Sequence, residues 1–200
     1  MKKLLVLIIF LVFISCKKES INNEEELNKS VITEKLTYEV INSLMKNILE
    51  ENQKQNIYVV CENFPKEKDG EMNDYMGISK MDSLFSSEDV KFIIEQNKTS
   101  KHFLLKKELL KNVRLIPNDT IESFRKRENG ENTFWEKYTK KYGDEGFYSI
   151  SKPLFSLDYK TVIISYGFHC GGLCGGGSTI ILRKINEKWE YKAELQNWVS

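Results

Sequence analysis

Residues 167–178 bring together two of the four cysteines and one of the two histidines of the chain. Two cysteines, Cys170 and Cys174, enclose three residues, and His169 directly precedes the first of them. Six of the eleven glycines of the chain lie in the same segment. Glycine loses more backbone entropy on folding than any other residue, so this density indicates a turn or a close approach of backbone. We therefore place the candidate site in this segment.

A disulfide between Cys170 and Cys174 is the first interpretation of the spacing. An extended segment would separate their α-carbons by about 13 Å, whereas a disulfide needs about 4.4–6.8 Å. The chain must therefore reverse between them, which Gly171 and Gly172 permit. A ring this small is expected to stabilise the fold by only about 2 kcal/mol.

Two other interpretations of the cysteines remain open. Zinc accepts cysteines at this spacing, so Cys170 and Cys174 could bind a metal together with His169 or Cys61. A thiol enzyme is the other, although the spacing is Cys-x3-Cys and no helix start follows to lower a thiol pKa.

The segment could also bind a small ligand. Consecutive glycine N–H groups can form an anion-binding nest, but this loop leads into an apolar run without the lysine that phosphate loops carry. A plain glycine-rich hairpin is the simpler interpretation. The candidate ligand-binding residues are His169, Gly175, Gly176 and Ser178.

Familiar enzyme signatures are missing from the sequence. It contains no zinc-protease helix, nucleophile elbow, Walker loop or dinucleotide fingerprint. We assign no catalytic residue, no metal ligand and no cofactor, and we expect a binding or structural module. The alternative is an envelope hydrolase or thiol enzyme that uses His169, Cys170 and Cys174. Trp189, Tyr191 and Trp198 could line a pocket, although strand aromatics more often belong to a core.

Length and composition indicate one globular domain. The chain has 200 residues, of which 40% are hydrophobic and 12% aromatic. Its net charge is +1, and removal of Lys2 and Lys3 would leave −1. No nucleic-acid partner is expected at such a balance.

The N-terminus has the features of an export signal. Lys2 and Lys3 precede an apolar run, residues 4–14, and a small residue, Ser15. Eleven apolar residues fall short of the ~20 that a membrane-spanning helix needs. This segment, ending in Ser15 and Cys16, resembles the signal of bacterial lipoproteins.

The lipoprotein resemblance implies cleavage before Cys16 and a diacylglyceryl group on its sulfur. The implied organisation is a signal peptide at 1–15, a lipidated flexible tether at 16–32 and one domain at 33–200. The expected partners are the membrane, through the lipid on Cys16, and an unidentified small-molecule or protein ligand. We expect the protein to reside in the cell envelope, anchored in the outer membrane, with its domain facing the periplasm or the cell surface.

Apolar periodicity and capping boxes predict helices mainly in the first two thirds of the chain. An apolar stripe predicts a helix over 34–51. Capping boxes at Ser86 with Asp89 and at Thr133 with Glu136 predict helices over 87–97 and up to Gly143. A further helix is expected from Asn118 or Asp119 through residue 127. Strands are expected at 57–61 and, less clearly, in the second half of 102–116.

After Gly146 the pattern changes to alternation, which predicts strands at 147–150, 161–169, 178–185 and 188–194. The fold class is therefore α+β, with N-terminal helices packed on a C-terminal antiparallel meander of about four strands.

The C-terminal part of the chain resembles a group of Bacteroidota lipoproteins that have no assigned activity. The residues that carry this resemblance are the 151–156 segment Ser-Lys-Pro-Leu-Phe-Ser, the Cys-Gly-Gly-Leu-Cys-Gly-Gly-Gly loop, the pair Lys188-Trp189 and the end Trp-Val-Ser. The similarity covers about residues 84–200. It implies an envelope address and a fold, without a reaction.

Overall fold

The computed structural model describes residues 33–52, 57–61, 83–100, 102–126 and 133–200. Two compact units divide the chain after Glu39. The described part of the first unit, residues 33–39, is helical, and the sheet belongs to the second unit, residues 40–200. The expected signal peptide, the lipidated Cys16 and the tether lie outside the described residues.

The second unit is built on a mixed seven-stranded sheet with the order β2-β1-β3-β5-β6-β7, in which β4 also pairs with β5. Its strands are β1 (Ile57–Cys61), β2 (Val113–Leu115), β3 (Phe147–Ile150), β4 (Leu154–Phe155), β5 (Thr161–Gly171), β6 (Cys174–Ile185) and β7 (Lys188–Val199). The pairs β3–β5, β5–β6 and β6–β7 are antiparallel. The predicted α+β class and four-stranded meander are therefore confirmed. The sequence did not predict that β1 extends this meander, in parallel with both β2 and β3.

The segment predicted as a glycine loop is mostly strand. β5 continues to Gly171, β6 begins at Cys174, and only Gly172 and Leu173 form the turn. β7 likewise runs to Val199, five residues beyond its predicted end. Glycine disfavours a strand on entropic grounds, so the prediction ended the strands early. Cross-strand pairing and the aromatic contact described below overcome that preference.

Helices are α2 (Ser87–Ser100), α3 (Asn118–Arg125) and α4 (Phe134–Tyr142), with a 3-10 turn at η2 (Lys107–Leu109). Residues 33–51 are also helical, as the apolar stripe predicted. Both predicted capping boxes are present, at Ser86 with Asp89 and at Thr133 with Glu136. The third helix differs from its prediction: its N-cap is Pro117, and it ends at Arg125. None of the described helices is both long and apolar enough to cross a bilayer.

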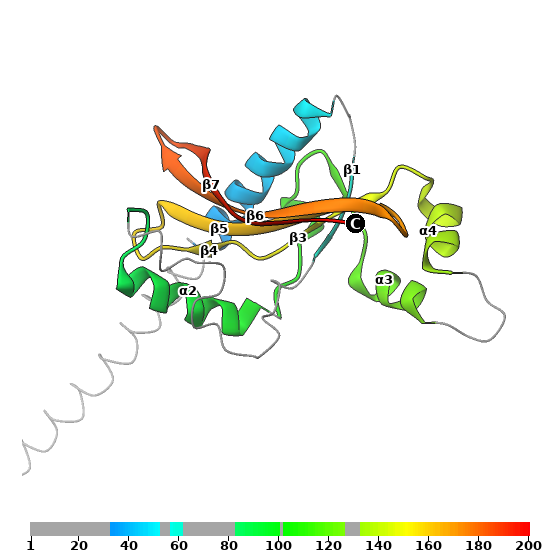
Figure 1. Ribbon diagram of the computed structural model, residues 1–200, viewed down its shortest axis with the longest axis horizontal. Coiled ribbons are helices and arrows are strands. Elements are labelled where there is room, and N and C mark those ends of the chain that lie inside the picture. The colour runs from blue at the N-terminus through cyan, green and yellow to red at the C-terminus, as the bar shows by residue number, and fades with distance from the viewer. Residues whose placement is uncertain (1–32, 53–56, 62–82, 101, 127–132) are drawn as a thin grey trace, which may run out of the picture. The chain divides into compact units, whose positions relative to one another are not determined.

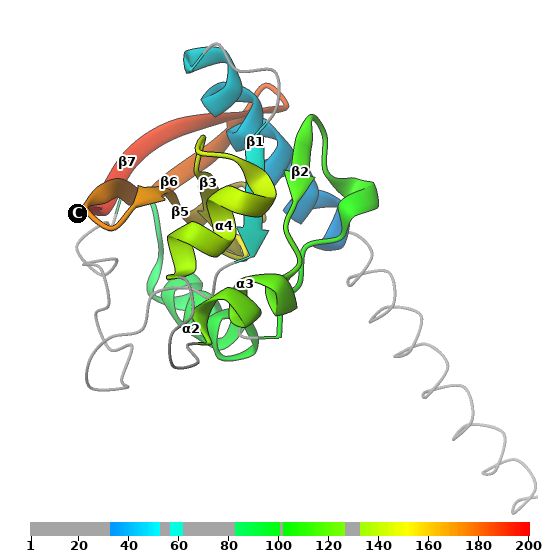
Figure 2. The ribbon, with the colours of Figure 1, turned by 90° about the vertical axis from the view of Figure 1, so that its right-hand side faces the viewer.

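Helices cover both faces of the sheet within the second unit. Figure 1 shows residues 40–51, the part of the blue helix that belongs to this unit, on one side of the sheet and α2 and α3 on the other. Figure 2 shows α3 and α4 next to one another beside β1. We name the two sheet faces after residues of the C-terminal hairpin, because side chains alternate between faces along a strand.

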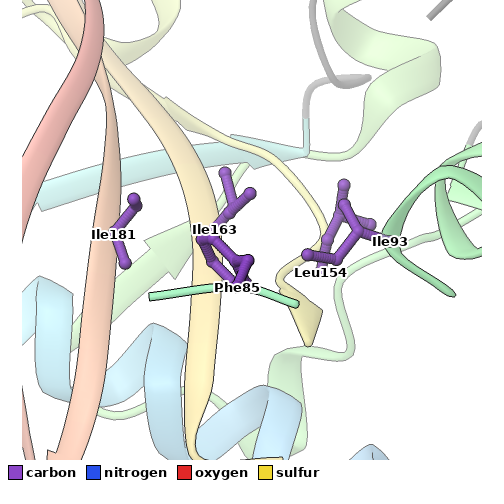
Figure 3. Close-up of a cluster of buried hydrophobic side chains, with 5 residues drawn as sticks. All are labelled: Phe85, Ile93, Leu154, Ile163 and Ile181. Carbon is purple, nitrogen blue, oxygen red and sulfur yellow. The ribbon is translucent and has the colours of Figure 1, made fainter. Parts of the chain in front are cut away.

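The His169 face carries Ser149, Ser151, Ser165, Gly167, His169, Gly175, Gly177, Thr179 and Trp198. The Ser178 face carries Tyr148, Tyr166, Phe168, Gly176 and Ser178. Two apolar clusters cover the His169 face. One joins α2 to the sheet through Phe85, Ile93, Leu154, Ile163 and Ile181 (Figure 3). The other joins α3 and α4 through Val60, Ile116, Ile121, Tyr138 and Phe147.

Candidate functional site

A disulfide closes the C-terminal hairpin, as the sequence predicts. It joins Cys170 at the end of β5 to Cys174 at the start of β6, with 5.1 Å between the two α-carbons. The turn of Gly172 and Leu173 supplies the chain reversal. With both sulfurs in this bond, neither Cys170 nor Cys174 offers the thiolate that a zinc site or a nucleophilic cysteine requires. Within the described residues, no three His, Cys, Asp or Glu side chains gather as a metal site would need.

Three neighbours hold the imidazole of His169. Its Nε2 shares a hydrogen bond of 2.9 Å with Oγ of Ser149 on the adjacent strand β3. The ring of Phe147 stacks on it at a centroid distance of 5.0 Å and an angle of 22°. The ring of Trp198 on β7 lies at a centroid distance of 5.5 Å from the imidazole, with an angle of 37° between the ring planes. Stacking and a hydrogen bond together fix the ring in one orientation.

The backbone beside His169 is equally constrained. Gly146 has φ +74°, and a Cβ there would collide with the carbonyl oxygen of His169. Only glycine combines this left-handed conformation with so close an approach. The hydroxyl of Tyr138 on α4 donates to the Gly146 carbonyl at 2.6 Å. Burial strongly raises the pKa of this Tyr138 hydroxyl, so it stays protonated and can donate.

Gly167 is the point where the site converges. A Cβ on Gly167 would lie 2.9 Å from Cζ2 of Trp198, 3.2 Å from Oγ of Ser149 and 3.4 Å from Nε2 of His169. The space that a side chain would take is therefore filled by an indole, a hydroxyl and an imidazole. A residue larger than glycine would separate them.

Trp198 lies across three glycines. Besides Gly167, a Cβ on Gly177 would lie 2.6 Å from its Nε1, and one on Gly175 would lie 3.5 Å from its Cζ3. Three different atoms of the indole thus contact three glycine positions on two strands. The residue remains 41% exposed. The indole therefore packs on the glycines of this hairpin with one part of its surface, and the rest remains exposed to solvent.

The four candidate ligand-binding residues do not share one face. His169 and Gly175 are register partners on the His169 face. Gly176 and Ser178 point to the other face, where Ser178 donates to Oε2 of Glu194 at 2.8 Å. The structure therefore brings together only two of the four.

The Ser178 face carries two phenols, of which Tyr148 is buried and Tyr166 is partly buried. Burial raises the pKa of Tyr166, and its hydrogen-bonding interaction with Ser178 opposes this shift. Burial likewise raises the pKa of Tyr148 on the same face. Both phenols are therefore neutral over the physiological pH range.

A row of hydroxyls runs across the His169 face between the two apolar clusters. Ser165 and Thr179 share a hydrogen bond of 2.6 Å, and Ser151 Oγ accepts from the Ser165 backbone N–H at 3.0 Å. Ser149 continues the row and bonds His169. Ser149, Ser151 and Thr179 are each at most 4% exposed. Each of these hydroxyls therefore has a hydrogen-bond partner: another hydroxyl for Ser165 and Thr179, backbone groups for Ser151 and the imidazole for Ser149.

Sequence reasoning missed Ser149 and Phe147, and it treated Trp198 chiefly as core. Of the three C-terminal aromatics it considered, Trp189 is buried, whereas Tyr191 is 59% exposed. Tyr191 pairs with Leu182, whose side chain lies on the Ser178 face. A usable signal was a tryptophan after the expected end of the last strand with polar residues two positions away on either side, Gln196 and Ser200.

The Ser149–His169 contact has the geometry of a nucleophile and its base, because the two atoms are within hydrogen-bond reach. Ser149, however, is only 3% exposed, and the indole of Trp198 reaches the same space above Gly167. This arrangement suits a hydroxyl that positions the imidazole. Attack on a substrate would first require the indole to move aside.

Comparison of the chain with family models, with curated proteins and with solved structures finds no match.

Proposed function

We propose that this chain is a lipid-anchored protein of the bacterial cell envelope that binds a ligand on the His169 face of its C-terminal hairpin. The observation that carries this proposal is the partly exposed indole of Trp198, which packs on glycines beside the fixed imidazole of His169. Exposing a rigid aromatic side chain to solvent costs free energy, and such exposed apolar surface is typical of binding sites.

The envelope address is supported by two independent features. Cys16 follows an export signal in a lipobox-like context. The disulfide of Cys170 and Cys174 is a bond that persists in oxidising compartments such as the periplasm. Two or three acyl chains on Cys16 would anchor the domain firmly, since each buried methylene contributes about 0.8 kcal/mol. We place the anchor in the outer membrane.

Cys16→Ser tests the address, with Cys61→Ser as the matched control. Cells expressing each form are labelled with palmitate, fractionated, and the mature N-terminus is determined by mass spectrometry. The native protein and Cys61→Ser should carry label, begin at Cys16 and sediment with the envelope. Cys16→Ser should lose the label and the cleavage. Equal labelling of all three forms contradicts the proposal.

A hydrolase is the second candidate, and the 2.9 Å contact of Ser149 with His169 favours it. This differs from the alternative drawn from sequence, which used Cys170 and Cys174 with the same histidine. Incubation with a fluorophosphonate probe and with p-nitrophenyl esters tests it. A hydrolase requires labelling and turnover that Ser149→Ala abolishes and that Ser123→Ala, an exposed serine of α3, retains. If the probe does not label the native protein, the hydrolase is excluded and the binding function remains.

A further inference from the structure

We propose that the exposed indole of Trp198, with Gln196 and Ser200 on either side, binds the ring of a neutral saccharide. This inference rests on the proposed binding function and specifies its ligand class. It follows from three features of the hairpin: the order of side chains along β7, the rigidity of the indole and the lack of a cationic lining in this part of the strand.

The first feature is an ordered row along β7. Gln196 pairs with Thr179 and Trp198 with Gly177, so both lie on the His169 face. Ser200 lies on the same side, because its Oγ and the Trp198 ring meet the same Cβ position of Gly175, at 3.1 and 3.5 Å. Neighbours two apart along a strand are separated by about 7 Å. An amide and a hydroxyl thus flank the indole, within reach of hydroxyls at the edge of a stacked ring.

The chemistry of a saccharide ring matches this row. One face of a pyranose carries C–H groups, which are weakly positive and meet the negative face of an aromatic ring favourably. Its hydroxyls project from the edge, where they need donors and acceptors. An amide such as Gln196 and a hydroxyl such as Ser200 each supply both. An indole alone would also suit an apolar ligand, but the polar groups on either side favour a polyhydroxylated one.

The second feature is pre-organisation. Trp198 contacts backbone positions on β5 and β6, and His169 beside it is held by Ser149. The disulfide ties the ends of these two strands. A platform that is already ordered loses little conformational freedom when a ligand arrives, which matters for a weakly bound sugar.

The third feature separates this ligand from other partners of exposed tryptophans. Stacked nucleic-acid bases need basic side chains that follow the phosphate backbone. Residues 194–200 contain no lysine or arginine, and the strand neighbours of Trp198 on its own face are Gln196 and Ser200. A drug-like apolar ligand needs a concave apolar pocket, whereas β7 is exposed along its second half. The surface therefore fits a neutral, hydroxyl-rich ring.

The experiment titrates the full-length oxidised protein in detergent with five neutral hexasaccharides, derived from starch, cellulose, chitin, mannan and xylan. The indole N–H NMR signal of Trp198 and isothermal calorimetry report binding. At least one hexasaccharide should shift that signal saturably. Trp198→Leu should weaken binding at least about tenfold, which is the size of effect that one lost stacking contact produces.

Two variants keep this result interpretable. Trp198→Phe retains an aromatic face and should bind within a few-fold of the native protein, which a purely structural role for the indole would not predict. Tyr191→Ala removes an aromatic side chain from the Ser178 face and should bind normally. Thermal unfolding of each variant checks that it is folded.

No shift with any of the five hexasaccharides overturns the inference, as does unchanged affinity in Trp198→Leu. Binding of a hexanucleotide or of free indole through Trp198 without saccharide binding overturns the ligand class and keeps the binding module. The proposed envelope address is tested separately by the Cys16→Ser fractionation, so the two can fail independently.

Discussion

The indole of Trp198 occupies the space in which a side chain on Gly177 would begin. A Cβ on Gly177 would lie 2.6 Å from Nε1 of Trp198 and 2.9 Å from Cα of Gly167 on the neighbouring strand. The same Cβ would lie 2.5 Å from the carbonyl oxygen of Tyr166 on β5. Glycine is therefore required here both by the backbone of β5 and by the indole on β7. An aromatic ring that covers glycines in a neighbouring strand restores the packing that the glycines lack.

Gly177→Ala should displace the indole. An added methyl group with no space costs about 1–3 kcal/mol of the free energy of unfolding. Urea denaturation measures that loss, and the emission spectrum of the folded variant should shift as Trp198 becomes more solvent-exposed. Gly172→Ala is the matched control. In the part of the chain that the structure describes, nothing lies within 4 Å of a Cβ at Gly172. Its stability should change by no more than about 0.5 kcal/mol, and equal losses for the two variants would contradict the role given to Trp198.

Ser149 and His169 should be energetically coupled. Ser149→Ala removes one hydrogen bond from Nε2 of the imidazole, which corresponds to about 1 kcal/mol of the free energy of unfolding. A double-mutant cycle with His169→Ala, measured by urea denaturation, should give a coupling energy of at least about 0.5 kcal/mol. Ser123→Ala in α3 replaces Ser149→Ala in the control cycle, because Ser123 bonds its own helix at Thr120. Additivity in the first cycle would mean that the serine does not position the imidazole.

The sequence sufficed for the elements whose signals are local. The capping boxes at Ser86 and Thr133 predicted the starts of α2 and α4, because a cap is made by residues three positions apart. The strands predicted at 178–185 and 188–194 leave a two-residue turn at Asn186 and Glu187, and both residues have positive φ, as a tight hairpin turn requires. The antiparallel meander follows from short connections between neighbouring strands.

The features that escaped prediction depend on residues far apart in the sequence. β1 joins β2 and β3 in parallel, and no local pattern states which strands lie beside one another. The glycines were assigned to a loop because entropy disfavours them in strands, whereas Trp198, more than twenty residues later, covers them. Ser149 looked like an ordinary strand serine until the fold placed it beside His169.

The disulfide should contribute modestly to stability. The Cys170→Ser/Cys174→Ser double variant should lose about 2 kcal/mol of the free energy of unfolding, as expected for so small a ring. A reductant should lower the urea midpoint of the native protein to a similar value and leave the double variant unchanged. If reduction leaves the native midpoint where it is, the bond does not stabilise the hairpin. A reductant effect that persists in the double variant would show that it acts elsewhere.

Tyr138 should make stability sensitive to alkaline pH. Burial raises the pKa of its hydroxyl, which donates to the Gly146 carbonyl at 2.6 Å. Since the folded-state pKa lies above the unfolded value of about 10, the contribution of Tyr138 is complete below pH 10. It is lost as the pH rises further, because ionisation of this phenol then stabilises the unfolded chain and not the folded one.

Tyr138→Phe removes both the hydrogen bond and the ionisation. At pH 7 the variant should be about 1 kcal/mol less stable than the native protein, the net value of one hydrogen bond. Between pH 10 and 12 the advantage of the native protein should fall by up to about 1.4 kcal/mol per pH unit and then change sign, since position 138 can ionise only in the unfolded state of the protein that keeps the tyrosine. Urea denaturation at pH 7, 10 and 11 measures it. Tyr148 and Tyr166, whose pKa values are also raised by burial, are present in both proteins and cancel in the comparison. A difference that stays constant with pH would mean that Tyr138 ionises as readily in the folded protein as in the unfolded chain, and that the contact with Gly146 does not shield it.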